Sequence, residues 1–182
     1  MSTQLQPSDI STDAPAAKAP KARVSLSADL RFEIADLYAA YTDTLDAADY
    51  KAWAEFFVDD AMYRIVPREN YIRGFPIAAM HCESKGMIED RAYACEQLNM
   101  TQPRVLRHFV SGIAIESAEG SDRFKVGANF LVVQTCFEQM TEIVMAGRYI
   151  DDIVRRDGRL LFQSRLCVYD SLLIPTSLVA PV

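Results

Sequence analysis

The segment EIVMAGRYIDDIVRRDGRLLFQSRLCVYDSLL, residues 142–173, decides the fold of this chain. It consists of two long runs rich in Val, Ile, Leu, Phe and Tyr, on either side of an Asp-Gly pair. Most of these residue types favour strands. A two-residue type I′ turn requires positive φ at both central positions, and Asp157-Gly158 meets that requirement. We therefore predict an antiparallel hairpin of two strands, Glu142–Arg156 and Arg159–Leu173.

The chain before this hairpin divides into a β-type part and a helical part. Two further β-type runs, Val105–Glu116 and Arg123–Phe137, lie on either side of a turn at Glu119-Gly120-Ser121-Asp122. Upstream of Pro103, apolar residues recur at spacings of three and four, as on one face of a helix. Helices followed by a long antiparallel meander are typical of an α+β protein, in which we expect the sheet to curl around the helices.

Caps and apolar spacing predict three helices before Pro103. The first is capped by Ser27, and its inward face is expected to consist of Leu30, Ile34, Leu37, Tyr41 and Leu45. A second, short helix is expected from Asp49, with Trp53, Phe56 and Phe57 inward, ending at Asp59-Asp60 before a strand over Ala61–Val66. Residues 68–76 are expected to form a loop. The third helix is predicted over Met87–Asn99, and its inward residues are expected to be Met87, Ile88, Ala92, Cys95 and Leu98.

Residues 1–24 differ in composition from the rest of the chain. They are rich in Ala, Pro, Ser, Thr and Lys and contain no aromatic residue. Such a segment cannot bury enough apolar surface to offset the entropy lost on ordering. We therefore expect a flexible N-terminal arm over residues 1–24 and a single domain over residues 25–182.

Charge and hydropathy exclude several classes of function. The chain has 25 acidic and 19 basic residues, a net charge of −6, which provides no basis for binding a phosphate backbone. No apolar run approaches the roughly 18 residues that span a bilayer, and no signal-peptide pattern is present. The expectation is a cytoplasmic protein that binds neither nucleic acid nor membrane. The four cysteines show no CxxC spacing and are interpreted as small buried hydrophobes.

Two constellations of residues could carry chemistry. His81-Cys82-Glu83 together with His108 could supply two imidazoles and a carboxylate to a non-haem iron, although nothing else in the spacing favours a metal site. Alternatively, Asp46 or Asp43 could orient His108 or His81 as a general base. The structural alternatives are two unrelated histidines and an Asp46 that only turns the chain at a helix end.

Other segments point to surfaces rather than to chemistry. Arg64–Glu69 and Arg148–Asp152 alternate charged and aromatic residues, as on a solvated or interfacial strand face. Residues 172–182 are almost wholly apolar, so they either pack back on their own sheet or bury a subunit interface. The chain lacks a CxH…CxxH Rieske pattern, a GxGxxG fingerprint, a P-loop and a GxSxG elbow. We therefore expect no redox cofactor in this chain.

Beyond these patterns, the chain resembles a known family. The run Leu45-Asp46 to Asp49-Tyr50-Lys51-Ala52-Trp53, then Phe56-Phe57, Asp60 and Tyr63, resembles the opening of the NTF2-like (cystatin-like), SnoaL-type cone. The later motifs are Met87-Ile88-Glu89-Asp90-Arg91, Arg107-His108-Phe109, Ala146-Gly147-Arg148-Tyr149-Ile150-Asp151, Asp157-Gly158-Arg159-Leu160 and Tyr169-Asp170-Ser171. In this order, over about residues 28–182, they resemble the small (β) subunits of aromatic-ring-hydroxylating dioxygenases.

The resemblance implies a fold and a role in catabolism of an aromatic compound. The implied fold is an α+β cone whose N-terminal helices pack in a strongly curved, mostly antiparallel sheet. The implied assembly is α3β3, in which the α subunit carries the Rieske [2Fe-2S] cluster and the mononuclear Fe(II). Electrons come from NAD(P)H through a reductase, with or without a ferredoxin. The loop Pro67-Arg68-Glu69-Asn70 and the apolar ending resemble subunits of enzymes that act on salicylate, anthranilate or terephthalate.

The β subunit itself is then a structural support without a catalytic centre. Its contacts with α subunits and other β subunits are expected at Arg68, Glu69, Tyr71, His81, Arg148, Asp170, Leu173 and Pro175. Two alternatives stay open. One is a stand-alone NTF2-like dehydratase, isomerase or hydrolase that uses Asp46 and His108, and the other is a ligand-binding module without chemistry.

Overall fold

The computed structural model describes residues 27–98, 103–120, 122–171, 174, 178 and 180–182. The strands are β1 (Phe57–Pro67), β2 (Met80–Cys82), β3 (Arg104–Glu119), β4 (Arg123–Cys136), β5 (Glu142–Arg156) and β6 (Arg159–Tyr169). The helices are α1 (Ala28–Asp46), α2 (Tyr50–Ala54), α3 (Arg68–Arg73) and α4 (Lys85–Tyr93), which continues as the π-helical turn η2 (Ala94–Leu98). Over the described residues, none of these helices is long and apolar enough to cross a membrane.

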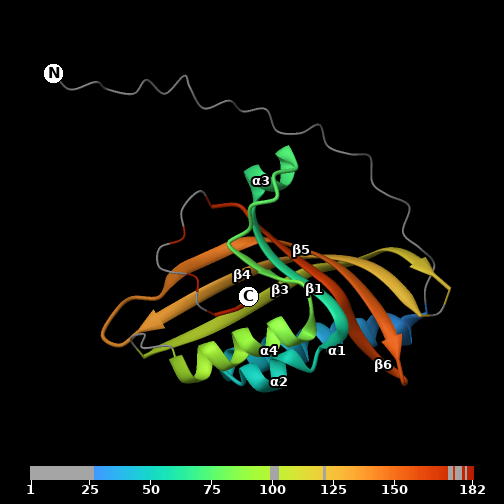
Figure 1. Cartoon of the computed structure of the whole chain (residues 1–182), viewed down its shortest axis with the longest axis horizontal. Helices are drawn as coiled ribbons and strands as arrows, with labels where there is room; N and C mark the ends of the chain where they lie inside the picture. The colour runs from blue at the N-terminus through green and yellow to red at the C-terminus, as the bar shows by residue number, and fades with distance from the viewer. Residues whose placement is uncertain (1–26, 99–102, 121, 172–173, 175–177, 179) are drawn as a thin grey trace.

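The strands form one curved, six-stranded sheet in the order β2-β1-β6-β5-β4-β3. Helices α1, α2 and α4 lie along one side of this sheet, whereas α3 stands apart from it (Figure 1). Neighbouring strands are antiparallel except β1 and β6, which are parallel. The predicted α+β arrangement, with helices held in a curved and mostly antiparallel sheet, is confirmed. The predicted arm over residues 1–24 lies outside the described residues.

The β5–β6 hairpin forms where the sequence predicts it. Asp157 has φ 49° and Gly158 has φ 78°, as a type I′ turn requires, and Arg156 pairs with Arg159 next to the turn. β5 has the predicted bounds, but β6 ends at Tyr169, four residues before the predicted end at Leu173. The reason is the neighbouring strand: Tyr169 pairs with Pro67, the last residue of β1, beyond which β6 loses that partner.

The second helix is shorter than predicted, and the prediction of its end was wrong. The Asp49 side chain caps α2 as expected, but the helix ends at Ala54 and Phe57 already belongs to β1. Asp59-Asp60 lies inside that strand. A register shift in β1 between Phe57 and Met62 forms a bulge, which lets both carboxylates reach solvent while Phe57 stays buried.

Residues 68–76 were predicted as a loop, but they include α3. Gly74 adopts a left-handed conformation with φ 68°, and its N–H donates to the carbonyl oxygens of Asn70 and Tyr71. Glu69 and Arg73 form an ion pair of 2.8 Å one helical turn apart. The prediction failed because Gly74 ends a short helix here and does not mark a loop throughout.

Helix α4 begins two residues before the predicted start. Ser84 caps it by accepting a hydrogen bond from the Met87 N–H. With this cap the helix buries Ile88 completely but leaves Met87 43% exposed, so the prediction is confirmed for Ile88 and wrong for Met87. Because a helix has 3.6 residues per turn, the Met87 side chain points about 100° away from Ile88 around the axis, here toward solvent.

The core lies between the helices and the concave face of the sheet. The predicted inward face of α1 is confirmed, since Ile34, Leu37, Tyr41 and Leu45 are buried and Leu30 packs against them. Aromatic rings fill the centre in edge-to-face contacts: Trp53 with Phe57 and Tyr63, and Tyr41 with Phe162. Such pairs add about 0.5–1.5 kcal/mol each beyond the burial of their apolar surface. The concave face is therefore a packed aromatic interior.

Candidate functional site

A buried ion pair lies at the centre of the concave face. Arg165 on β6 stands directly opposite Asp151 on β5. Its Nε and Nη2 atoms donate to the two carboxylate oxygens at 3.1 and 2.7 Å, and neither side chain is exposed. The Tyr38 hydroxyl on α1 also donates to Asp151. The pair thus joins the first helix to the two central strands.

Aromatic rings enclose the charge of Arg165. Its guanidinium carbon lies 3.9 Å from the ring centre of Phe162, 4.0 Å from Tyr41, 4.2 Å from Tyr149 and 4.9 Å from Tyr38. Burial is the largest single influence and would lower the pKa of Arg165, but Asp151, Tyr41 and Tyr38 together outweigh it and hold this pKa well above its ordinary value. Arg165 is therefore a permanent cation inside the cone.

The predicted pair of Asp46 and His108 does form. Asp46 is the last residue of α1, and one of its carboxylate oxygens lies 2.7 Å from Nδ1 and 3.0 Å from the backbone nitrogen of His108 on β3. The His108 side chain is fully buried, and its Nε2 has no hydrogen-bond partner. Burial lowers the pKa of His108, opposed by Asp46, so the ring is neutral at neutral pH.

The other proposed combinations do not assemble. His81 lies on β2, half-exposed, with its Nε2 3.5 Å from Glu83 Oε1, while His108 pairs with Asp46 on β3. Among the residues that the structure describes, no group of three His, Cys, Asp or Glu side chains could hold a metal ion. The facial triad of His81, Glu83 and His108 is therefore wrong, and the carboxylate–imidazole alternative is the one with matching geometry.

Four of the predicted interface residues lie together around α3. Arg68 and Glu69 are in its first turn, and Tyr71, 48% exposed, is in its second. Arg68 Nη1 lies 3.5 Å from Oδ1 of Asp170, the residue just beyond the end of β6. Three more apolar side chains on or just after this helix are also exposed: Ile72 63%, Phe75 49% and Ile77 69%. We call residues 68–77 the α3 arm.

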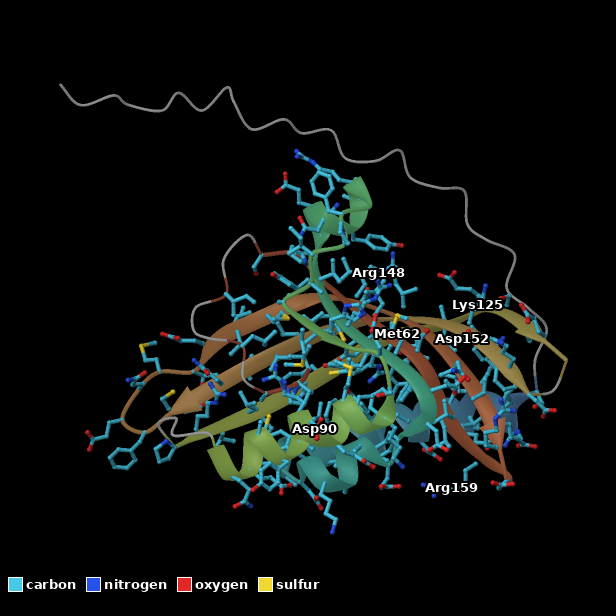
Figure 2. The ribbon with its side chains drawn as sticks, viewed as in Figure 1. Met62, Asp90, Lys125, Arg148, Asp152 and Arg159 are labelled. Atoms are coloured by element: carbon cyan, nitrogen blue, oxygen red, sulfur yellow. The ribbon has the colours of Figure 1, made fainter. Side chains whose placement is uncertain are left out.

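The other predicted interface residues divide into three groups. Arg148 is exposed on β5 and pairs with Val168, which pairs in turn with Val66, one residue before the end of β1. Figure 2 accordingly shows Arg148 on the part of the sheet nearest α3. His81 lies on the neighbouring edge, paired with Arg64. Leu173 and Pro175 lie outside the described residues.

The apolar ending of the chain packs on its own fold as far as it is described. Ile174 and Leu178 are half-buried against the core, and Ala180–Val182 is buried. Of the two predicted alternatives for the C-terminal segment, these residues therefore confirm packing against the chain's own sheet.

Sequence reasoning missed Arg165 and assigned Asp151 to a solvated or interfacial face. On β5 the residues alternate faces, so Asp151 shares the core face with Tyr149 and Ile153, while Arg148 and Asp152 face outward. A charged residue between two large apolar ones on the same face was an available signal for a buried partner.

Three comparisons bear on the family. The model of the SnoaL-like domain matches residues 27–166. The anthranilate 1,2-dioxygenase small subunit of Burkholderia cepacia is 32% identical over 151 residues, which cover 83% of this chain and 93% of that protein. Subunit beta 1 of the terminal oxygenase component of terephthalate 1,2-dioxygenase from Comamonas sp. is 28% identical over 150 residues, which cover 82% of this chain and 97% of that protein.

A solved structure agrees with both relatives. The β subunit of a proposed aromatic-ring-hydroxylating dioxygenase from Novosphingobium aromaticivorans superimposes with a TM-score of 0.77 at 36% identity, covering 85% of this chain and 97% of its own. The matched fold is the curved sheet with its helices described above, and the family model covers all of the motifs that suggested the resemblance except Tyr169-Asp170-Ser171. The chain therefore belongs to the SnoaL-like domain family and, within it, to the small (β) subunits of aromatic-ring-hydroxylating dioxygenases.

Proposed function

We propose that this chain supports a Rieske-type α subunit structurally and binds it through the α3 arm. The α subunit would carry the Rieske [2Fe-2S] cluster and the mononuclear iron, in an α3β3 complex that receives electrons from NAD(P)H through a reductase. The relatives that act on anthranilate and terephthalate support an aromatic carboxylate as the substrate of the complex.

The observation that carries this proposal is the exposed apolar surface of the α3 arm. Tyr71, Ile72, Phe75 and Ile77 are each about half exposed or more on a segment that stands away from the sheet (Figure 1). Exposed apolar groups gathered in one place mark interaction sites in soluble proteins. Ion pairs of Glu69 with Arg73 and of Arg68 with Asp170 surround these side chains, as in the polar rim of a protein interface.

Assembly with the α subunit tests the role of the arm. The chain is co-expressed with a Rieske-type α subunit from the same genome, and the mass of the complex is measured by native mass spectrometry. Ile77→Asp should weaken assembly by at least about 30-fold, the effect of losing a central interface side chain worth about 2 kcal/mol. Phe32→Asp is the matched control, because Phe32 on α1 has the same exposed fraction of 69%. Normal assembly of Ile77→Asp, or an equal loss of assembly in both variants, would contradict the proposal.

The second candidate function is a stand-alone dehydratase or isomerase that uses the Asp46–His108 pair. The distance of 2.7 Å between Asp46 Oδ1 and His108 Nδ1 favours it, since an oriented, neutral imidazole is the form a general base requires. Against it, Nε2 is buried, and the cavity inside the cone is lined by other residues. An assembled complex whose rate of substrate oxidation is unchanged in His108→Ala would exclude a catalytic role in the oxygenase. Iron-free turnover by the isolated chain would instead establish the second candidate.

A further inference from the structure

A groove lies on the outside of the fold, between α1 and the turn that joins β5 to β6. Its volume is about 320 Å³, and its lining residues come from α1, from the chain just before β1 and from the start of β6. Among the described residues, it shares no lining residue with the cavity inside the cone. Figure 2 shows one of its lining residues, Arg159, on the side of the molecule away from α3. The groove is therefore separate from both the cone interior and the α3 arm.

The floor of this groove is apolar. Leu37 and Leu160 line it and are largely buried, and Phe56 packs against the core from the chain just before β1. Ala40 also lines the groove, and it is exposed. Its side chain is too small to fill the space above the floor. A segment with small apolar side chains can therefore cover this floor without displacing any part of the fold.

Carboxylates follow the groove along the exposed face of α1. Four acidic residues lie within about 80° of one another around the helix axis: Asp29, Glu33, Asp36 and Asp43. Arg155 binds both carboxylate oxygens of Glu33, at 2.5 and 2.7 Å. Asp36 and Asp43 are exposed, and their side chains form no hydrogen bond or ion pair with any residue that the structure describes. This face of α1 therefore presents two unpaired carboxylates, seven residues apart, beside an apolar floor.

The part of the sequence just before α1 has the complementary composition. Residues 14–24, with the sequence APAAKAPKARV, contain no acidic residue, and their cations are Lys18, Lys21 and Arg23. The other residues are Ala, Pro and Val. The two prolines favour the polyproline II conformation, which advances about 3.1 Å per residue. The matched SnoaL-like domain begins at residue 27, so this segment is not part of the fold that the family shares.

The spacing of the charges matches if the chain reverses direction at residues 25–26. A polyproline II segment that returns along α1 then places Lys21 about 12 Å and Lys18 about 22 Å from the reversal. On the helix, at 1.5 Å per residue, Asp36 lies about 12 Å and Asp43 about 23 Å beyond the first residue. Each lysine therefore arrives beside an unpaired carboxylate. The two lysines also lie on one side of the segment, because polyproline II has three residues per turn.

We propose that residues 14–24 dock in cis in the groove between α1 and the β5–β6 turn. Lys21 pairs with Asp36 and Lys18 with Asp43, and the alanine and proline side chains between them cover the apolar floor. Arg159, a cation on the β6 wall, keeps the lysines on the α1 side of the groove.

Docking in cis is favoured over docking on a second copy because the connection is short. A short linker holds the segment at a millimolar effective concentration, so weak contacts are enough to keep it in place. Exposed ion pairs are individually weak and are screened by salt, so the segment should leave the groove at high ionic strength. The segment adds to a surface that the domain already provides, so it needs no core of its own, which its composition could not form.

Zero-length cross-linking of the full chain with a carbodiimide tests this docking. The reagent joins a lysine amine to a carboxylate only where the two groups are in contact, and mass spectrometry identifies the joined peptides. At about 0.01 M salt, links of Lys21 to Asp36 and of Lys18 to Asp43 should form. At about 1 M salt, where the Debye length is only about 3 Å, their yield should fall at least about fivefold. The ion pair of Lys85 with Glu55, at 2.9 Å, is the control for the reagent and should be linked at both concentrations.

An isotope mixture distinguishes docking in cis from docking on a second copy. Chains of natural isotope abundance are mixed with an equal amount of ¹⁵N-labelled chains before the reagent is added. Docking in cis gives links between peptides of the same isotope, whereas docking on a second copy gives mixed links as often as uniform ones. Mixed links at that frequency overturn the proposal.

Charge variants show whether the helix face itself holds the segment. Asp36→Lys should lower the yield of the Lys18–Asp43 link at least about fivefold at low salt, because the new cation repels Lys21. Adding Lys21→Asp to this variant reverses both charges of the pair and should restore the yield. Asp90→Lys is the matched control, since it makes the same change of charge at an exposed position on α4 and should leave the yield unchanged.

Three further results overturn the proposal. One is the absence of both predicted links in a sample in which Lys85 and Glu55 are linked. Another is a yield of links from Lys18 and Lys21 to Asp90 that equals their yield to the carboxylates of α1. The third is an equal effect of Asp36→Lys and Asp90→Lys on the Lys18–Asp43 link.

Discussion

The buried ion pair of Arg165 and Asp151 makes the most demanding prediction, through the variant Asp151→Asn. The substitution keeps the shape of the side chain and removes its charge. Both native side chains have no exposed surface, so the Arg165 cation would remain in the interior without its counter-charge. Removing one partner of a buried pair costs about 3–5 kcal/mol.

The stability measurement follows directly from that magnitude. In a domain of this size each kcal/mol shifts Tm by roughly 2–4 °C, so Asp151→Asn should melt about 6–20 °C below the parent chain. Thermal and urea unfolding followed by circular dichroism measure the loss. The matched control is Asp152→Asn, the next residue on β5, whose carboxylate pairs with Arg123 at the surface. Exposed pairs contribute little, so this variant should unfold nearly as the parent does.

A double variant separates the cost of the isolated charge from simple loss of packing. Asp151→Leu with Arg165→Met replaces the pair by apolar side chains, and such replacements are often neutral or stabilising by about 1–4 kcal/mol. We expect the double variant to recover most of the stability that Asp151→Leu alone loses. The reasoning is refuted if Asp151→Asn costs less than about 1 kcal/mol, or if the double variant is as unstable as the sum of the single ones.

Further predictions concern pH and backbone packing. Burial lowers the pKa of His108 in the folded chain, so the unfolded chain binds that proton more readily and the free energy of unfolding decreases as pH falls below about 6.5. Urea titrations at about pH 7.5 and about pH 5.5 measure this decrease in the free energy of unfolding. The decrease should be smaller in His108→Gln than in the parent chain, whereas His81→Gln, which replaces an exposed histidine, should show the same decrease as the parent. Gly147→Ala would place a Cβ 2.0 Å from the Val168 carbonyl oxygen, and should cost about 1–3 kcal/mol in urea unfolding. In Gly86→Ala, on α4, the added Cβ would contact only Ser84 Oγ, at an ordinary distance of 3.8 Å. This substitution should instead stabilise the chain by about 0.5–1 kcal/mol.

Local signals explain which elements could be predicted. The β5–β6 turn depends on Asp157 and Gly158 alone, and the start of α1 depends on Ser27, whose hydroxyl accepts from Leu30 N–H. Such interactions span a few residues, so a single sequence reveals them. The predicted end of α2 was wrong because contacts with β6 decide where β1 begins, and no local sequence pattern reveals the bulge there. The prediction for residues 68–76 was wrong because Gly74 ends a short helix there and does not mark a loop.

The candidate site shows the same division. Asp46 and His108 could be named as a pair because both residue types suit acid–base chemistry, and the resemblance to a cone suggested that helix and sheet meet. Arg165 could not be named, because nothing around it distinguishes a buried arginine from one on a solvated strand. The insertion of Ala180–Val182 among Tyr41, Tyr63 and Cys167 likewise joins positions far apart in the chain.

The sequence by itself determined the family, the order of helices before strands, and the hairpin around Asp157-Gly158. Only the tertiary structure decided which charges meet in the core. Continued in register from the pair Arg156–Arg159, the hairpin would place Asp151 opposite Ser164 and leave Arg165 on the outer face. A bulge between Asp152 and Ile153 shifts the pairing by one residue, so that Arg165 stands opposite Asp151 instead. Because side chains alternate faces along a strand, that single residue moves a cation from solvent into the aromatic interior.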